Sequence, residues 1–211
     1  MSCDHDYFER GYTLVIGVDE VGRGCLAGPV TCAAVSFRPT DCPIEGIKDS
    51  KKVSQKKRRI LSGHIYITHQ TTVATRSARQ IDEMNILNAT LDAMREAVLQ
   101  CAEAEERDGD RTIVLVDGNK LIPDLGEMEQ ICIIRGDSKS YAIGCASIVA
   151  KHTRDTHMCE LQDDSDYGFG RHKGYGTKYH YERLTECGPG PHHRTSFRLS
   201  GGYKRDSSSK K

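Results

Sequence analysis

The stretch 13–29, TLVIGVDEVGRGCLAGP, restricts the fold of this chain more than any other part of the sequence. Its apolar run at 14–18 is rich in β-branched residues, which favour a strand buried in a sheet. The run ends at two adjacent carboxylates, Asp19 and Glu20, and a buried carboxylate is costly unless a cation lies against it. Because successive strand residues point to opposite faces, we expect the strand to break there if both carboxylates share one centre. The stretch therefore predicts a metal-binding strand end, with carboxylates that only cap the strand in solvent as the alternative.

Charge is balanced over the 211 residues, with 30 Lys and Arg against 30 Asp and Glu, so net charge does not identify a nucleic-acid-binding protein. Basic residues nevertheless gather at 48–59 and again after residue 171, while 82–110 is mostly acidic. A neutral protein with basic patches can contact phosphates locally, although a solvated face is the other interpretation.

The nine cysteines are an odd number and form no CxxC pair, and several lie in apolar runs, where a thiol behaves as a small hydrophobic group. The sequence has neither a secretory signal nor an apolar run long enough to span a bilayer. We therefore expect a reduced, cytoplasmic protein with no zinc site and no membrane contact.

Hydrophobic periodicity predicts a chain in which strands and helices alternate after an early hairpin-like pair of strands. This pattern indicates the α/β class with a mixed sheet. Residues 1–12 lack periodicity and are predicted to be a flexible N-terminus, and the polar, basic residues 201–211 to be a disordered tail. Further strands are expected at 30–37, 70–75, 113–116 and 131–134, and helices at 54–69, 81–104 and 140–162.

Acidic residues end three of the predicted apolar strands, namely Asp19 with Glu20, Asp117 and Asp137. Oxygen ligands without Cys or His favour Mg²⁺ or Mn²⁺ over zinc. Clusters of this kind hold two metals about 3.5–4 Å apart in enzymes that cleave phosphodiesters. A single strand-end Asp is more often a turn residue, and the sequence alone does not show that these strand ends converge.

The segment GVDEVGRGCLAGPV closely resembles the first motif of ribonuclease HII, a family that cuts RNA in RNA–DNA hybrids and nicks DNA duplexes at embedded ribonucleotides. The family more often has Ala at Val21 and often Pro at Cys25, neither of which supplies a charge. The resemblance covers about 13–197 and implies a ribonuclease H-like mixed β-sheet flanked by helices, with a small C-terminal helical extension. It divides the chain into a catalytic core at 13–163 and a substrate-contacting segment at 164–200 that packs on the core.

The same resemblance implies a four-carboxylate site made by Asp19, Glu20, Asp117 in LVDGNK and Asp137 in RGDSKS. Asp155 also matches a family position but lies far inside a predicted helix, so it is the reserve candidate for the fourth carboxylate. Three motifs resemble the family's substrate contacts: a GRG loop that senses the ribose 2′-OH, a DSKK motif that binds phosphates, and an HKGYGT motif whose tyrosine stacks on a sugar. With a further phosphate contact, they correspond to Gly22, Arg23, Gly24, Lys51, Lys52, Tyr175 and Arg194. From the residues alone, the lysines could be a solvated basic turn and Tyr175 a loop anchor.

The resemblance implies an endoribonuclease that uses two Mn²⁺ or Mg²⁺ ions and leaves 3′-hydroxyl and 5′-phosphate ends. Its partner is an RNA–DNA hybrid or a ribonucleotide-containing DNA duplex. We expect a monomer, and a clamp-type protein partner remains open without being indicated. About a dozen residues precede the first strand, too few for the extra domain of ribonuclease HIII, and the added segments of the eukaryotic type are not evident, so we expect a bacterial-type, single-chain enzyme. The alternatives are a non-catalytic binder of hybrid duplexes and a resolvase or transposase of the same fold, which would lack the GRG and HKGYGT motifs.

Overall fold

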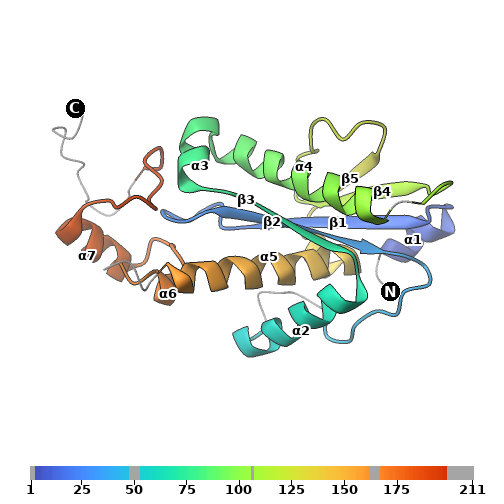
Figure 1. Cartoon of the computed structure of the whole chain (residues 1–211), viewed down its shortest axis with the longest axis horizontal. Coiled ribbons are helices and arrows are strands. Elements are labelled where there is room, and N and C mark those ends of the chain that lie inside the picture. The colour runs from blue at the N-terminus through green and yellow to red at the C-terminus, as the bar shows by residue number, and fades with distance from the viewer. Residues whose placement is uncertain (1–2, 48–52, 106, 162–166, 199–211) are drawn as a thin grey trace.

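The computed structural model describes residues 3–47, 53–105, 107–161 and 167–198. One mixed sheet lies between two layers of helices, with α3 and α4 on one face and α2 and α5 on the other (Figure 1). The elements are α1 (Asp4–Glu9), β1 (Leu14–Val21), β2 (Val30–Phe37), α2 (Gln55–Thr68), β3 (Thr71–Arg76), α3 (Ala78–Met84), α4 (Ile86–Glu105), β4 (Thr112–Asp117), β5 (Glu129–Ile133), the 3₁₀ turn η2 (Gly136–Ser138), α5 (Tyr141–Glu160), α6 (Phe169–His172) and α7 (Lys178–Cys187).

The strands are ordered β3-β2-β1-β4-β5. β1 pairs antiparallel with β2, and β2 with β3, whereas β1 pairs parallel with β4, and β4 with β5. The predicted α/β class with a mixed sheet is confirmed. The predicted helix 81–104 is divided into α3 and α4 at Asn85, which has a φ of 64° and whose side chain accepts a hydrogen bond from the Asn88 amide at 3.0 Å.

Alternation along the strands gives the sheet two apolar faces. Val15 and Leu115 belong to the core that packs on α5, and Val18 and Val116 to the core that packs on α4. Helix α5 lies very close to β1, because a side chain at Gly17 would overlap the backbone of Ala142. Glycine at position 17 is therefore required for the close approach of this helix to the sheet.

The first twelve residues differ from the flexible N-terminus that the sequence predicted. Residues 4–9 form α1, and the fully buried Asp4 accepts hydrogen bonds from the Ser140 hydroxyl at 2.7 Å and the Tyr141 amide at 2.6 Å. Backbone amides at the start of a helix, such as that of Tyr141 in α5, have no partner within the helix, so the carboxylate of Asp4 is stabilising there. Tyr7 and Tyr12 are buried as well. A helix of six residues is too short for its periodicity to be recognised in the sequence.

At the opposite end of the molecule from α1, helices α6 and α7 lie beside the loop that leaves β1 (Figure 1). The Leu26 amide donates to the Gly174 carbonyl at 2.8 Å, and the Gly28 amide to the His192 carbonyl at 2.8 Å. The C-terminal segment therefore packs on the core, while the boundary proposed near 163–164 and the tail at 201–211 lie outside the described residues.

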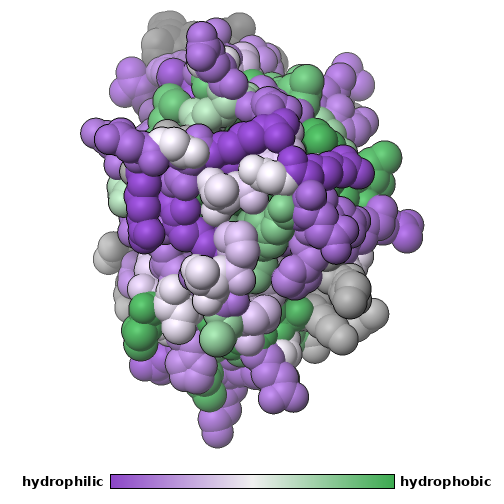
Figure 2. Space-filling view, turned by 90° about the vertical axis from the view of Figure 1, so that its right-hand side faces the viewer, coloured by the Kyte–Doolittle hydropathy of each residue, from purple (hydrophilic) through white to green (hydrophobic). Residues whose placement is uncertain are grey.

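The end of the molecule at which α1 lies is largely hydrophilic, with small apolar areas between the polar side chains (Figure 2). Within the described ranges, no helix combines the length and apolar character that crossing a membrane requires.

Candidate active site

Asp19 and Asp117 lie side by side on the α5 face of the sheet. β1 and β4 are in parallel register up to the pair Val18 and Val116, so the next residue of each strand is an aspartate. Adjacent strands are about 4.8 Å apart, which brings the two carboxylates close together. Asp19 is 6% exposed, and its Oδ1 accepts the Glu20 amide at 2.7 Å. The side chain of Ser147, on α5, also hydrogen-bonds the Asp19 carboxylate.

Glu20 reaches this site in a way that differs from the prediction. β1 does not break at the carboxylates but continues to Val21, paired with β2 throughout. The strand that ends is β4, whose last residue is Asp117. Glu20 follows Asp19 on β1 and so points to the α4 face, yet its charge raises the pKa of Asp19, and the charge of Asp117 raises the pKa of Glu20. Its present partner is Arg23, at 3.2 Å.

Burial and mutual repulsion make this cluster costly to ionise. Burial raises the pKa of Asp19 well above its usual value, and the charges of Glu20 and Asp117 raise it further. The pKa of Glu20 is also raised, first by burial and then by Asp117, although Arg23 opposes the shift. Like charges held together in a low-dielectric site are the arrangement that a bound cation would relieve.

Asp137 directly follows Gly136, which is hydrogen-bonded to one member of this cluster. The amide of its neighbour Gly136 donates to Asp117 Oδ1 at 2.6 Å, and a side chain at Gly136 would crowd Ile143. Asp137 itself lines a hollow of about 670 Å³ together with residues 43–47 and 138–141. The Gly136 amide thus connects η2 to the end of β4.

Asp155, the reserve candidate, has two cationic partners. Its carboxylate accepts from Arg58 of α2 at 3.2 Å and from Lys151 at 2.7 Å. The pair with Arg58 is buried, with both side chains 9% exposed. Asp155 is therefore neutralised by its own neighbours and connects α5 to α2.

The carboxylate set suits a hard divalent cation by its chemistry. Its members are oxygen donors, Asp19 is buried, and the charges of Asp19, Glu20 and Asp117 repel one another. As the side chains stand, however, no three His, Cys, Asp or Glu groups of the described residues form a metal-binding group. Glu20, turned towards Arg23, would have to rotate to become a ligand.

The GRG loop rests on two buried arginines. Arg194 is 1% exposed and donates to the carbonyls of Gly22 at 2.7 Å, Arg23 at 2.9 Å and Gly28 at 2.9 Å and 3.0 Å. Arg154, fully buried, donates to the carbonyls of Ala27, Pro29 and Lys173. A guanidinium buried in this way is not exposed for the phosphate contact expected of Arg194, so its observed role is to hold the loop.

Tyr175 stands beside this loop. It is 41% exposed, its hydroxyl hydrogen-bonds Cys25, and the Lys151 ammonium lies 5.7 Å from its ring centre. The preceding Gly174 has a φ of 81°, and a side chain there would overlap the Ala27 carbonyl. Gly174 is therefore required both for its backbone conformation and for the close approach that brings Tyr175 to the loop.

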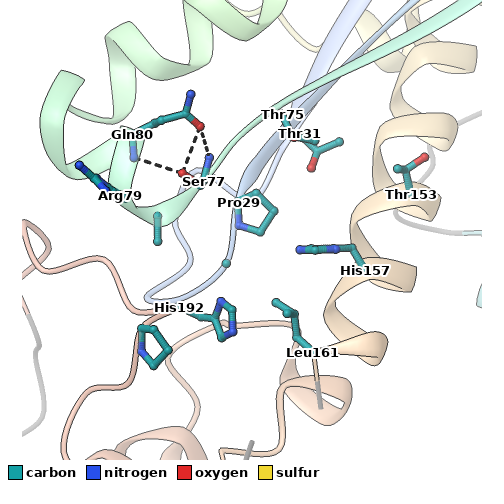
Figure 3. Close-up of a pocket in the computed structure, with 13 residues that line it drawn as sticks. Pro29, Thr31, Thr75, Ser77, Arg79, Gln80, Thr153, His157, Leu161 and His192 are labelled. Carbon is teal, nitrogen blue, oxygen red and sulfur yellow. Dashed lines mark hydrogen bonds between the residues drawn. The ribbon is translucent and has the colours of Figure 1, made fainter. Parts of the chain in front are cut away.

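Two of the predicted phosphate-binding residues cannot be placed, and two residues that support the site were not predicted. Lys51 and Lys52 lie outside the described residues. Ser147 and Arg154 were not predicted as contributors, because their roles depend on contacts with β1 and the loop after it. Figure 3 shows a second hollow, of about 400 Å³, bordered by Pro29, Ser77, His157 and His192; none of its thirteen lining residues is Asp or Glu, so it is not the carboxylate site.

Comparison with known proteins agrees with the fold and the motifs. The ribonuclease HII family profile matches residues 16–200. Ribonuclease HII of Caldicellulosiruptor bescii is 46% identical over 206 residues, covering 93% of this chain and 96% of that protein. The ribonuclease HII in a complex with PCNA from Archaeoglobus fulgidus superposes with a TM-score of 0.68 at 24% identity, covering 90% of this chain and 98% of that one. Bst-RNase HIII in complex with Mn²⁺ gives a TM-score of 0.62 at 19% identity, over 72% of this chain and 55% of that one.

The sheet and its strand-end carboxylates, together with these similarities, define a hydrolase of the ribonuclease H type, an endonuclease. Within that class, the family is decided by the profile match over residues 16–200 and by the 46% identity to a ribonuclease HII over 206 residues. The chain belongs to the ribonuclease HII family.

Proposed function

We propose that this ribonuclease H endonuclease cleaves the RNA strand of RNA–DNA hybrids and nicks 5′ of single ribonucleotides embedded in duplex DNA, leaving 3′-hydroxyl and 5′-phosphate ends. The observation that carries the proposal is that Asp19 and Asp117 follow the last paired position of β1 and β4, with the charge of Glu20 interacting with both. A bare anionic cluster would repel a phosphodiester, so the site needs cations before it can accept a nucleic acid.

Asp19, Glu20, Asp117 and Asp137 are the proposed ligands of two divalent ions, Mg²⁺ or Mn²⁺. Bound there, such ions activate a water and stabilise the leaving oxygen of the phosphodiester. These residues belong to β1, β4 and η2, and the hydrogen bond from the Gly136 amide supports the proposed ligand role of Asp117. Ser147 and the Glu20 amide do the same for Asp19. That a ribonuclease HIII of the same fold is described in complex with Mn²⁺ agrees with this choice of ion.

Recognition of the ribose is assigned to the GRG loop and Tyr175. The carbonyls of Gly22 and Arg23 are held by Arg194, so the loop is rigid before substrate arrives. The Tyr175 ring is proposed to pack on the sugar next to the scissile ribonucleotide, and its partial exposure supports this contact. A 2′-OH both donates and accepts hydrogen bonds, and backbone groups can therefore distinguish RNA from DNA. Lys51 and Lys52 are proposed to bind phosphates of the duplex.

A single assay separates this function from binding alone. The protein is incubated with a duplex that contains one ribonucleotide, in Mg²⁺ or Mn²⁺ and then with EDTA, while binding is measured on the same duplex. We expect cleavage that EDTA abolishes, and loss of cleavage in Asp19→Asn and Asp117→Asn. Tight binding without cleavage in either metal would instead indicate a non-catalytic binder of hybrid duplexes.

The fourth carboxylate is tested with two further variants. Asp137→Asn should lower the turnover number by at least as much as it lowers duplex affinity. Asp155→Asn removes a carboxylate that pairs with Arg58 and Lys151, so some catalysis should survive. A folded but inactive Asp155→Asn beside an active Asp137→Asn would reverse the assignment.

The remaining expectations concern the setting of the enzyme. We propose that it acts as a monomer in the cytoplasm, and the described cysteines are all free thiols, as expected of a reduced protein. A homologue of the same fold occurs in a complex with the clamp PCNA, so a clamp-type partner is a reasonable candidate for this chain. Co-migration of the protein with a sliding clamp in gel filtration would test that partner directly.

A further inference from the structure

Three histidines lie buried beneath Tyr175, where they join α6, α7 and the closing segment. His172, His180 and His193 are 8%, 0% and 5% exposed. The His172 and His180 rings are stacked, with centroids 4.2 Å apart and an interplanar angle of 18°. His180 Nε2 and His193 Nε2 are 3.0 Å apart, a distance that requires one nitrogen to donate and the other to accept.

The backbone partners decide which nitrogen carries each proton. His180 Nδ1 lies 2.9 Å from the Tyr175 carbonyl, which can only accept, so Nδ1 is protonated and Nε2 accepts. His193 Nδ1 accepts the Gly190 amide at 2.9 Å, a shorter contact than the 3.3 Å to the Gly190 carbonyl, so its proton is on Nε2. The two tautomers match: His193 Nε2–H donates to His180 Nε2, and both rings are neutral.

This pair connects Tyr175 to the loop that carries the GRG motif. His193 forms an isolated β-bridge with Ala27, and the next amide, that of Arg194, donates to the Leu26 carbonyl at 2.8 Å. The path therefore runs from the Tyr175 carbonyl through two imidazoles to the backbone of the loop. A second connection, from the Leu26 amide to the Gly174 carbonyl, is independent of the histidines.

We propose that His180 and His193 are positioning residues, which as a neutral hydrogen-bonded pair fix the Tyr175 backbone relative to the GRG loop and thereby set the cleavage rate at a single ribonucleotide. The inference rests on the role proposed above for Tyr175. An added proton on either ring would place two donors face to face. That proton would also be poorly tolerated by the surroundings: burial lowers the pKa of both histidines to about 4, and the neighbouring imidazoles of His172 and His192 oppose a further positive charge.

The groups around the pair leave little to stabilise an imidazolium. The Phe169 ring lies 5.8 Å from His180 and 5.5 Å from His193, and the cations Arg171 and Lys173 act on the stacked His172. Burial and the neighbouring histidines lower the pKa of His180 and His193, and among the described residues only the backbone carbonyls of Tyr175 and Gly190 oppose that shift.

Two substitutions at His180 each preserve a different half of its hydrogen bonding. In His180→Asn, the amide nitrogen takes about the position of Nδ1 and keeps the bond to Tyr175, while the link to His193 is lost. In His180→Gln, the side-chain oxygen reaches the position of Nε2 and keeps the link to His193, while the bond to Tyr175 is lost. Loss of one such bond corresponds to roughly 2- to 13-fold in rate. Each variant breaks one link of the path between Tyr175 and the loop, so we expect both His180→Gln and His180→Asn to slow single-turnover cleavage of a one-ribonucleotide duplex within that range.

The decisive measurement is a double-mutant cycle with Tyr175→Ala in the same assay, with His157→Gln, an exposed histidine on α5, as the control. If His180 acts through Tyr175, His180→Gln has no further effect once Tyr175 is Ala. Additive losses would overturn this inference alone. A near-native rate for Tyr175→Ala would overturn the proposed contact of Tyr175, and this inference with it.

A spectroscopic test does not depend on the variants folding. In ¹⁵N-histidine spectra of the wild-type protein at pH 5–8, His180 should carry its proton on Nδ1 and His193 on Nε2, and neither ring should titrate. A ring that titrates near the ordinary histidine value of about 6.5, or the opposite tautomers, would overturn the proposal.

Discussion

Replacing Asp19 by Asn should make the metal-free protein more stable while abolishing its activity. The Asp19 and Asp117 carboxylates come from neighbouring positions on adjacent strands, and Glu20 acts on both. Two charges about 5 Å apart repel by roughly 3 kcal/mol at an effective dielectric constant of about 20. Because the raised pKa of Asp19 lets a proton relieve part of this repulsion, we expect a gain of about 1–2 kcal/mol. The Asn side chain keeps an oxygen that can accept the Glu20 amide and the Ser147 hydroxyl.

The assay is thermal unfolding in EDTA at pH 7.5, where a gain of this size corresponds to about 2–8 °C for a chain of this length. Asp155→Asn is the matched control, since it is the same chemical change at a carboxylate that is paired with Arg58 and Lys151. It should lower stability by about 1–3 kcal/mol. Addition of Mn²⁺ should then raise the melting temperature of the wild type more than that of Asp19→Asn. A melting temperature of Asp19→Asn below that of the wild type in EDTA would refute this electrostatic explanation. A shift of the melting temperature in the same direction for both variants would also refute it.

Three other outcomes are expected. Tyr175→Ala should lose roughly 5- to 150-fold in single-turnover rate on a one-ribonucleotide duplex with little change in binding, and Tyr175→Phe should retain more of the rate if ring packing dominates; equal, near-native rates would leave Tyr175 as a loop anchor. Asp4→Ala should lower the free energy of unfolding by about 1–2 kcal/mol in urea titrations, because it exposes unpaired amides at the start of α5, and an unchanged midpoint would contradict that cap. Finally, burial lowers the pKa of His180 and His193 to about 4, so the unfolded chain binds more protons than the folded one between about pH 6.5 and pH 4. The stability that the two neutral histidines contribute is therefore complete above that window and is lost as the pH falls through it. Urea titrations at several pH values should show a smaller acid-induced loss of the free energy of unfolding in His180→Asn than in the wild type.

How far the site could be predicted depends on how local each signal is. Asp19 and Asp117 were predicted as site residues because each follows an apolar run, a pattern visible in a few residues. The register that aligns them follows from the parallel pairing of β1 with β4, which the sequence did not show. The break predicted in the first strand at its two carboxylates does not occur, because β1 stays paired with β2 as far as Val21.

Residues that act on the backbone were the hardest to foresee. Arg194 was expected to contact phosphate, yet its partners are carbonyls about 170 residues earlier in the chain, and no charge pattern identifies a carbonyl as a partner. The histidine pair was missed for the same reason, because its tautomers are fixed by peptide groups of Tyr175 and Gly190. The core of the fold is set by hydrophobic alternation, whereas the shape of the substrate loop is set by these long-range backbone contacts.

The buried carboxylate of Asp4 also has a consequence for how the chain reaches its native state. Its partner amide, that of Tyr141, is 137 residues further along the chain. At the usual pace of synthesis, about 5–20 residues per second, α1 waits roughly 7–27 s for the start of α5 to be made. During that time, the core cluster that contains Tyr7 lacks its residues from α5. Docking of α1 is therefore among the later events on a ribosome, and a nascent chain that stalls before residue 141 should remain open to proteases at its N-terminal end.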